Sequence, residues 1–445
     1  MLLVSFAKPS NRLLWALWSC GSLAMAVMAI GFQMSNGDLN YYFRGVRSPG
    51  DPDSPLGEYP DVGTWPLHLI AQLTGGNQTA FRIVFMLGCI ALSAAFLQAL
   101  IRHGGRSGSQ RGAAMWVVFW ICSGPITITR LDILPGLLVA LAFGLVATRP
   151  RMASALLALA TAMKLWPGVL GAALVGHWKD RSTWSRIAAF FTALVALCTL
   201  TVLFGGTDRL LSPLSYQGSR GLQIESVLAT PFVIAAWFDP RWSFAYTDSK
   251  SFEVSGPGVE SGIFASTLLT AAVLLFAVGA ALVALFRAPQ GPQRWTPSLA
   301  VCIICGIMVS NKVFSPQYLL WLAPLIAISL QKPSTSRELR AIGYVLPVMA
   351  LLTFLVYPVF YDWLIIGDPQ LIPVSLLTLR NLGLLAVTGL AFAWWRREVE
   401  GGRVGTLPES QLSERSRRGR VKNKPRIPTA HTAMTAHHAI RKSAH

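Results

Sequence analysis

An aspartate, Asp38, directly follows the first long apolar stretch of the chain, in the run Gly37-Asp38-Leu39-Asn40-Tyr41-Tyr42. A carboxylate at the end of an apolar segment, beside aromatic rings that lower the local dielectric constant, can accept the proton of a substrate hydroxyl. We therefore interpret Asp38 as a candidate general base. The alternative is an interfacial helix cap or a solvated loop acid.

Basic side chains stand at the ends of several other apolar segments. They are Arg130 in Arg130-Leu131-Asp132, Lys164 in Lys164-Leu165-Trp166-Pro167, and Lys312 in the segment from Lys312 to Tyr318, while Arg220 lies in the long connection 206–261. An unpaired charge is costly at such a position, so Arg130 and Asp132 should be paired or bound to a polar ligand. Together they predict a cationic pocket for a phosphate group. A structural Arg130–Asp132 ion pair, or lysines that extend to a membrane interface, are the alternatives.

The run from Tyr216 to Ser226 is a compact polar cluster. Arg220, Gln223 and Glu225 mix hydrogen-bond donors and acceptors at a spacing suited to sugar hydroxyls and phosphate. Gln317 follows Lys312 closely and joins this group of candidate binding residues. His68, after Trp65-Pro66, is either a second proton carrier or an interfacial residue.

The composition requires a membrane around these residues. The 445 residues are 53% hydrophobic and 13% charged, with a mean hydropathy of +0.49, whereas soluble domains are about a quarter charged. The cysteines all lie in apolar stretches and form neither a disulfide framework nor a zinc site. We predict no metal and no cofactor.

Apolar runs between basic flanks predict an all-α integral membrane protein with about twelve membrane segments. They cover residues 13–34, 80–101, 112–129, 133–148, 152–163, 167–178, 186–205, 262–286, 297–312, 316–330, 341–361 and 372–395. Every connection on the side of the N-terminus is basic, and only six of the 20 acidic residues fall on that side. Both termini are therefore predicted to be cytoplasmic, in a multi-pass plasma-membrane protein.

Two long connections on the predicted outer side, 35–79 and 206–261, contain the amphipathic stretches 64–73 and 227–237. Such connections tend to be ordered functional elements at a membrane surface. The segments between 133 and 178 are too short to cross a hydrocarbon core of about 30 Å as free helices. Broken helices of this kind are tolerated where they line a protein-buried or watery cavity.

The chain divides into a membrane domain, residues 1–395, and a basic tail, residues 396–445. The tail lacks apolar periodicity, which predicts disorder on the cytoplasmic side. Its basic run 415–426 should be attracted to anionic lipid head groups, at about 1 kcal/mol per charge. Nucleic-acid binding is the less favoured interpretation of this run.

The ordered set of motifs resembles glycosyltransferase family 87 of actinobacteria, in the GT-C superfamily of polytopic glycosyltransferases. The resemblance extends over residues 13–395 and rests on Asp38, Tyr59-Pro60 with Trp65-Pro66, and the motifs at Arg130, Lys164, Arg220 and Lys312. It implies transfer of a sugar, usually mannose, from a polyprenyl-phosphate lipid donor to an extracytoplasmic glycolipid or cell-wall glycan acceptor. The displacement would be inverting, with Asp38 as the base. Tyr59-Pro60-Asp61 departs from the Tyr-Pro-Pro that is common in the family.

A secondary transporter or lipid flippase is the main alternative, since such proteins also use broken helices and intramembrane charges. A transporter should show repeated halves with charges near the middle of the membrane. Here no clear repeat is found, and the charges gather at the predicted outer turns. The sequence therefore favours the transferase, with the site outside the cytoplasm.

Overall fold

The chain folds into a helical bundle that carries one small β-hairpin. The structure, a computed structural model, describes residues 9–48, 56–218, 220–287, 296–332 and 334–404. The residues up to Val399 form one compact unit, which contains all of the candidate site residues. This confirms a mainly helical fold.

Within the described residues, six helical spans are long and apolar enough to cross a membrane. They are α1 (Asn11–Gly31), α4 (Gln78–Ser107), α9 (Arg181–Gly218), α11 (Val259–Arg287), α14 (Arg337–Phe354) with the π-helix η3 (Leu355–Val359), and α16 (Leu371–Val404). Only 11% to 44% of the residues in their most apolar windows are buried in the protein. Most of their apolar surface therefore remains for contact with lipid.

Shorter helices fill the inside of the bundle. They are α5 (Arg111–Cys122), α6 (Ile126–Thr129), α7 (Ile133–Leu145), α8 (Pro150–Met163), η1 (Trp166–Leu174), α12 (Thr296–Ser310), η2 (Pro316–Tyr318) and α13 (Leu319–Leu330). Every residue of α13 except Ile328 is buried, and α5, α7, α12 and α14 pack against this helix. A Cβ atom at Gly136 in α7 would overlap the carbonyl oxygen of Leu320. Short helices thus pack within protein, as expected for the region between 133 and 178.

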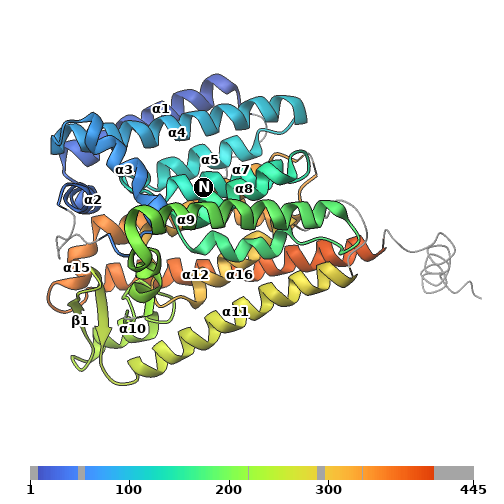
Figure 1. The fold of residues 1–445 in the computed structure, drawn as a ribbon. Coiled ribbons are helices and arrows are strands. Elements are labelled where there is room, and N and C mark those ends of the chain that lie inside the picture. The colour runs from blue at the N-terminus through green and yellow to red at the C-terminus, as the bar shows by residue number, and fades with distance from the viewer. Residues whose placement is uncertain (1–8, 49–55, 219, 288–295, 333, 405–445) are drawn as a thin grey trace, which may run out of the picture. The chain divides into compact units, whose positions relative to one another are not determined.

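Small elements gather at one end of the bundle (Figure 1), here named the cavity end. They are α2 (Gly37–Arg47), α3 (Asp61–Leu73), α10 (Thr230–Phe238), β1 (Ser243–Tyr246), β2 (Phe252–Ser255) and α15 (Tyr361–Ile365). Helix α3 confirms the predicted amphipathic stretch 64–73. Helix α10 covers most of the stretch 227–237, but its sequence is apolar on all sides, so this stretch is a helix without the predicted amphipathic character. The antiparallel hairpin, with Ser243 opposite Ser255 and Tyr246 opposite Phe252, was not predicted.

A break in α9 directs its last turns toward the cavity end. Gly206 has a φ of 80° and a ψ of 173°, which interrupts the helical backbone and favours glycine because it has no Cβ. Beyond this break, Arg209 contacts the loop before α3, with its Nη1 3.2 Å from the Leu56 carbonyl oxygen and its Nε 3.6 Å from Asp61 Oδ1. The change of direction at Gly206 therefore brings the end of α9 into contact with the segment around α3, next to the site.

Each of the twelve predicted segments coincides with a helix or with two successive helices. Because only six satisfy the length and hydropathy of a full span among the described residues, the count of about twelve stays a prediction. Helix α16 continues beyond Trp395 to Val404, so the predicted tail begins in a helix. The basic run 415–426 lies outside the described residues.

Candidate active site

Seven of the ten predicted site residues line one cavity of about 460 Å³ at the cavity end. These residues, which come from widely separated parts of the sequence, are Asp38, Arg130, Lys164, Arg220, Gln223, Glu225 and Gln317. The cavity wall is built from α2, the loops around residues 58, 130 and 164, the end of α9, the hairpin, and η2 with η3. The structure therefore brings most of the predicted site residues together in one cavity.

The other three predicted residues do not line this cavity. Asp132 lies directly behind Lys164 and is fully buried. The Lys312 ammonium points to the main chain and donates a 2.7 Å hydrogen bond to the carbonyl oxygen of Arg220. His68 is exposed on α3. The shared pocket expected for Lys164 and Lys312 is thus not formed by their ammonium groups.

The candidate base Asp38 forms an ion pair with Arg130. Its side chain is 35% exposed, whereas that of Arg130 is 4% exposed. The guanidinium also donates a 3.1 Å hydrogen bond to the Tyr357 hydroxyl, and its Nε has no hydrogen-bond partner among the described residues. The pair holds a carboxylate at the cavity surface while it leaves part of a buried cation unsatisfied.

Lys164 is held at the cavity by a carboxylate and by aromatic rings. Its ammonium lies 2.7 Å from Asp132 Oδ1, which also accepts a 2.6 Å hydrogen bond from the Trp321 indole. The rings of Tyr59, Tyr318 and Trp321 surround the ammonium, with centroids 5.1 to 5.8 Å away. Cation–π contacts and the ion pair together fix a positive charge whose exposed side faces the cavity.

Arg220 connects the cavity wall to the hairpin. Its Nη2 donates to Ser251 Oγ at 2.8 Å and to the Ser249 carbonyl oxygen at 3.3 Å, and its guanidinium lies over the Tyr216 ring. The loss of water around Lys312, which supports Arg220 from behind, lowers the pKa of that ammonium. Lys312 and Arg220 are therefore close together, and Lys312 is partly desolvated.

Gln223 and Glu225 are fixed by the surrounding main chain and by α16. Gln223 accepts a 3.0 Å hydrogen bond from the Phe314 amide. Glu225 Oε2 lies 2.8 Å from Arg380 Nη1, and neither side chain is more than 2% exposed. Arg380 and its neighbour Asn381 were missed from the sequence, although two strongly polar residues inside an apolar segment indicate a buried partner.

Further cavity residues were also missed as candidates. Seven of the nine tyrosines of the chain line the cavity, namely Tyr41, Tyr59, Tyr216, Tyr246, Tyr318, Tyr357 and Tyr361. Glu58 and the exposed Arg44 line it as well. The Tyr41 hydroxyl donates a 2.8 Å hydrogen bond to Glu58 Oε2. Phenol rings combine apolar faces with hydroxyl groups, a combination that suits the two kinds of surface on a sugar.

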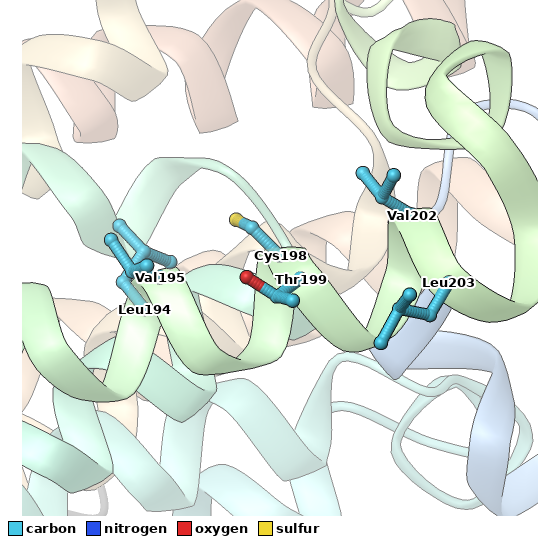
Figure 2. A pocket seen from close by; sticks show the side chains of 6 residues that line it. All are labelled: Leu194, Val195, Cys198, Thr199, Val202 and Leu203. Atoms are coloured by element: carbon cyan, nitrogen blue, oxygen red, sulfur yellow. The ribbon is translucent and has the colours of Figure 1, made fainter.

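A second hollow is different in character and position. Figure 2 shows its six lining side chains, all of which come from the part of α9 before the break: Leu194, Val195, Cys198, Thr199, Val202 and Leu203. It has a volume of about 360 Å³ and no charged residue in its wall. It lies on a helix whose most apolar window is only 11% buried in the protein, and its lining is mostly apolar. The charged cavity is therefore the better candidate for chemistry.

No group of three or more His, Cys, Asp and Glu residues suited to a metal ion occurs in the described part of the chain. The family model of glycosyltransferase family 87 matches residues 59–316, more than half of the sequence. That range includes Arg130, Lys164 and Arg220, while Gln317 and the candidate base Asp38 lie outside it. Neither the curated proteins nor the solved structures gave a match. The family match favours a transferase over a transporter or flippase.

Proposed function

Because the chain belongs to glycosyltransferase family 87 and is therefore a membrane glycosyltransferase, we propose that it transfers a hexose, namely mannose, from a polyprenyl-phosphate donor. The acceptor is an extracytoplasmic glycolipid or cell-wall glycan, and the displacement inverts the anomeric carbon. The observation that supports this proposal is a single cavity in which a surface carboxylate, Asp38, meets several fixed cations. The membrane around the bundle supplies the lipid donor.

Asp38 acts as the general base in this reaction. It takes the proton of the acceptor hydroxyl as that oxygen forms a bond to the anomeric carbon. The bond from the same carbon to the phosphate oxygen breaks, and the electron pair leaves with the polyprenyl phosphate. The ion pair with Arg130 orients the carboxylate before the substrates bind.

Arg130, Lys164 and Arg220 bind the donor phosphate and stabilise the charge that grows on it as the bond breaks. Arginine is suited to this because its planar guanidinium can bind two phosphate oxygens. Lys312 is reassigned as a positioning residue, because its ammonium holds the Arg220 carbonyl oxygen. Gln317, whose Oε1 has no hydrogen-bond partner among the described residues, and Gln223 bind sugar hydroxyls.

We place the cavity outside the cytoplasm, with both termini inside. A cysteine at the exposed, cavity-end Glu260 should react with an impermeant maleimide added to intact cells, whereas one at the exposed Arg181 should not. The positive-inside distribution of Arg and Lys supports this orientation. The reverse labelling would place the cavity in the cytoplasm and contradict the proposal.

The activity is tested by incubating the purified full chain, in vesicles that contain a membrane lipid extract, with radiolabelled polyprenyl-phosphate-mannose. We expect label to move to a lipid or glycan product, and Asp38→Asn to prevent the transfer. Parallel reactions with labelled polyprenyl-phosphate arabinofuranose test the donor sugar. If wild-type protein transfers label only from another donor class, such as a nucleotide sugar, the proposal is wrong.

A further inference from the structure

Glu58 differs from the other carboxylates of the cavity wall in its partners. Asp38 is paired with Arg130 and Glu225 with Arg380, whereas Glu58 has no ion pair among the described residues. Its one side-chain hydrogen bond comes from the Tyr41 hydroxyl, at 2.8 Å. An ionised carboxylate offers about four lone-pair positions, so Glu58 retains acceptor capacity on the side that faces the cavity.

The residues around Glu58 fix the orientation of its carboxylate. Tyr41 is also held by the amide of Leu56, which donates to its hydroxyl oxygen at 3.1 Å, so the hydrogen that bonds Glu58 is fixed in place. Asp38 lies three residues before Tyr41 on α2, which puts both side chains on the same face of that helix. The Glu58–Tyr41 pair is therefore next to the base and belongs to the same wall.

An unpaired carboxylate selects its ligand by charge. It repels phosphate and carboxylate groups, and it accepts short, charge-assisted hydrogen bonds from hydroxyl groups. Burial in the cavity wall also raises the pKa of Glu58, and the more basic carboxylate is the stronger hydrogen-bond acceptor. The cations Lys164 and Arg220 also act electrostatically on Glu58 and partly offset this increase in its pKa. The carboxylate and the phosphate-binding groups therefore share one cavity.

We propose that Glu58, oriented by Tyr41, binds hydroxyl groups of the acceptor adjacent to the hydroxyl that reacts. The reacting end of the acceptor is then an uncharged polyol, a sugar or a cyclitol, and carries no phosphate or carboxylate at that position. This inference rests on the proposed function, since it assigns the acceptor side of the same cavity.

The test measures acceptor and donor constants separately. Full-length protein in vesicles is given radiolabelled polyprenyl-phosphate-mannose, and the acceptor is varied as the mole fraction of membrane lipid extract. We expect Glu58→Gln to raise the apparent KM for the extract by about tenfold to a hundredfold, the range for loss of a charge-assisted hydrogen bond, with the donor KM unchanged. Tyr41→Phe should give a smaller rise, and Glu260→Gln, an exposed carboxylate outside the cavity, should give none.

A competition arm tests the charge of the acceptor. Octyl mannoside should inhibit transfer by the wild-type protein more strongly than octyl glucuronide, and Glu58→Gln should remove this difference. Equal inhibition of the wild type by the two compounds, or equal changes in both constants on substitution, would overturn the role of Glu58 while transfer itself remained. If the wild type transfers no label from the donor, the proposed function fails and this inference fails with it.

Discussion

Glu225 and Asp38 each form an ion pair with an arginine, but the two regions differ in how many of their polar atoms have hydrogen-bond partners. Arg380 donates to the side chain of Glu225 at 2.8 Å, to its carbonyl oxygen at 2.5 Å and to Asn381 at 3.0 Å. It is fully buried, with its guanidinium 4.2 Å from the Phe314 ring centroid. Every nitrogen of this guanidinium has a partner.

In the region around Asp38, some buried donors and acceptors have no hydrogen-bond partner among the described residues. Arg130 Nε and Asp132 Oδ2 are buried without a hydrogen-bond partner in the part of the chain that is described, and the Asp38 side chain is partly exposed to the cavity. Leaving a buried polar group unsatisfied costs about 1 to 3 kcal/mol. The fully hydrogen-bonded pair of Glu225 and Arg380 therefore stabilises the fold, and we propose that the groups without partners around Asp38 bind the substrate.

The strongest test of this comparison is Asp38→Asn. The amide keeps the shape of the carboxylate but cannot accept the proton, so we expect turnover to fall by about 10² to 10⁴-fold, with insertion and thermal unfolding little changed. The measurement is labelled-sugar transfer by protein of verified folding. Asp362→Asn, at an exposed carboxylate of the same end, is the control. A loss below tenfold would remove Asp38 from the role of base.

Substitution in the Glu225–Arg380 pair should lower the stability of the protein. Arg380→Met leaves Glu225 buried and unpaired, and we expect a loss of about 3 to 5 kcal/mol in the free energy of unfolding. Thermal unfolding in detergent measures it. The control is Arg241→Met, which removes a 2.8 Å ion pair to Asp239 between side chains that are 68% and 31% exposed and should leave the free energy of unfolding almost unchanged. Similar effects of the two substitutions would contradict the assignment of Glu225 and Arg380 to stability.

Two lysines distinguish direct from indirect contact with the donor. Lys164→Met should lower kcat/KM for the donor by about tenfold to a hundredfold, because it removes a charge-assisted contact worth about 1.5 to 3 kcal/mol. Lys312→Met should have a smaller effect, since its ammonium contacts the Arg220 carbonyl oxygen. Steady-state kinetics with varied donor measure both. Equal losses of kcat/KM in the two variants would instead support the shared phosphate pocket that was expected from the sequence.

The smallest expected effect is a pH dependence of stability at Glu58. Burial raises the pKa of this carboxyl above its ordinary value of 4.5, so the folded protein binds the proton more tightly than the unfolded chain. The resulting stability is present at acidic pH and is lost as the pH rises through the folded pKa. Glutamine does not titrate.

The Tm of Glu58→Gln relative to wild type should therefore increase from pH 4.5 toward neutral pH, by a few degrees at most. Differential scanning fluorimetry of both proteins across this range measures the change. A difference that is constant with pH would mean that the carboxyl does not titrate differently in the folded and unfolded states.

The apolar segments could be located from the sequence because lipid contact and internal packing both require long runs of apolar residues. The grouping of Asp38, Arg130, Lys164 and Arg220 could also be predicted, because all were expected in turns or connections on the same side of the membrane. The Lys312 contact could not, since the direction of an ammonium depends on the fold of the loop around it. The pairing of Tyr41 with Glu58 depends in the same way on the path of the loop that joins α2 to α3.

The buried position of α13 has a consequence for the assembly of the protein in the membrane. This helix lies at residues 319–330, yet α5 and α7, which pack against it, are synthesised far earlier. Until α13 emerges from the ribosome, its partners lack the surface that covers them, and α7 alone is too short for a stable span. The early helices must therefore wait at the insertion machinery or in a loose intermediate. Biogenesis should be completed late, when α13 enters the bundle.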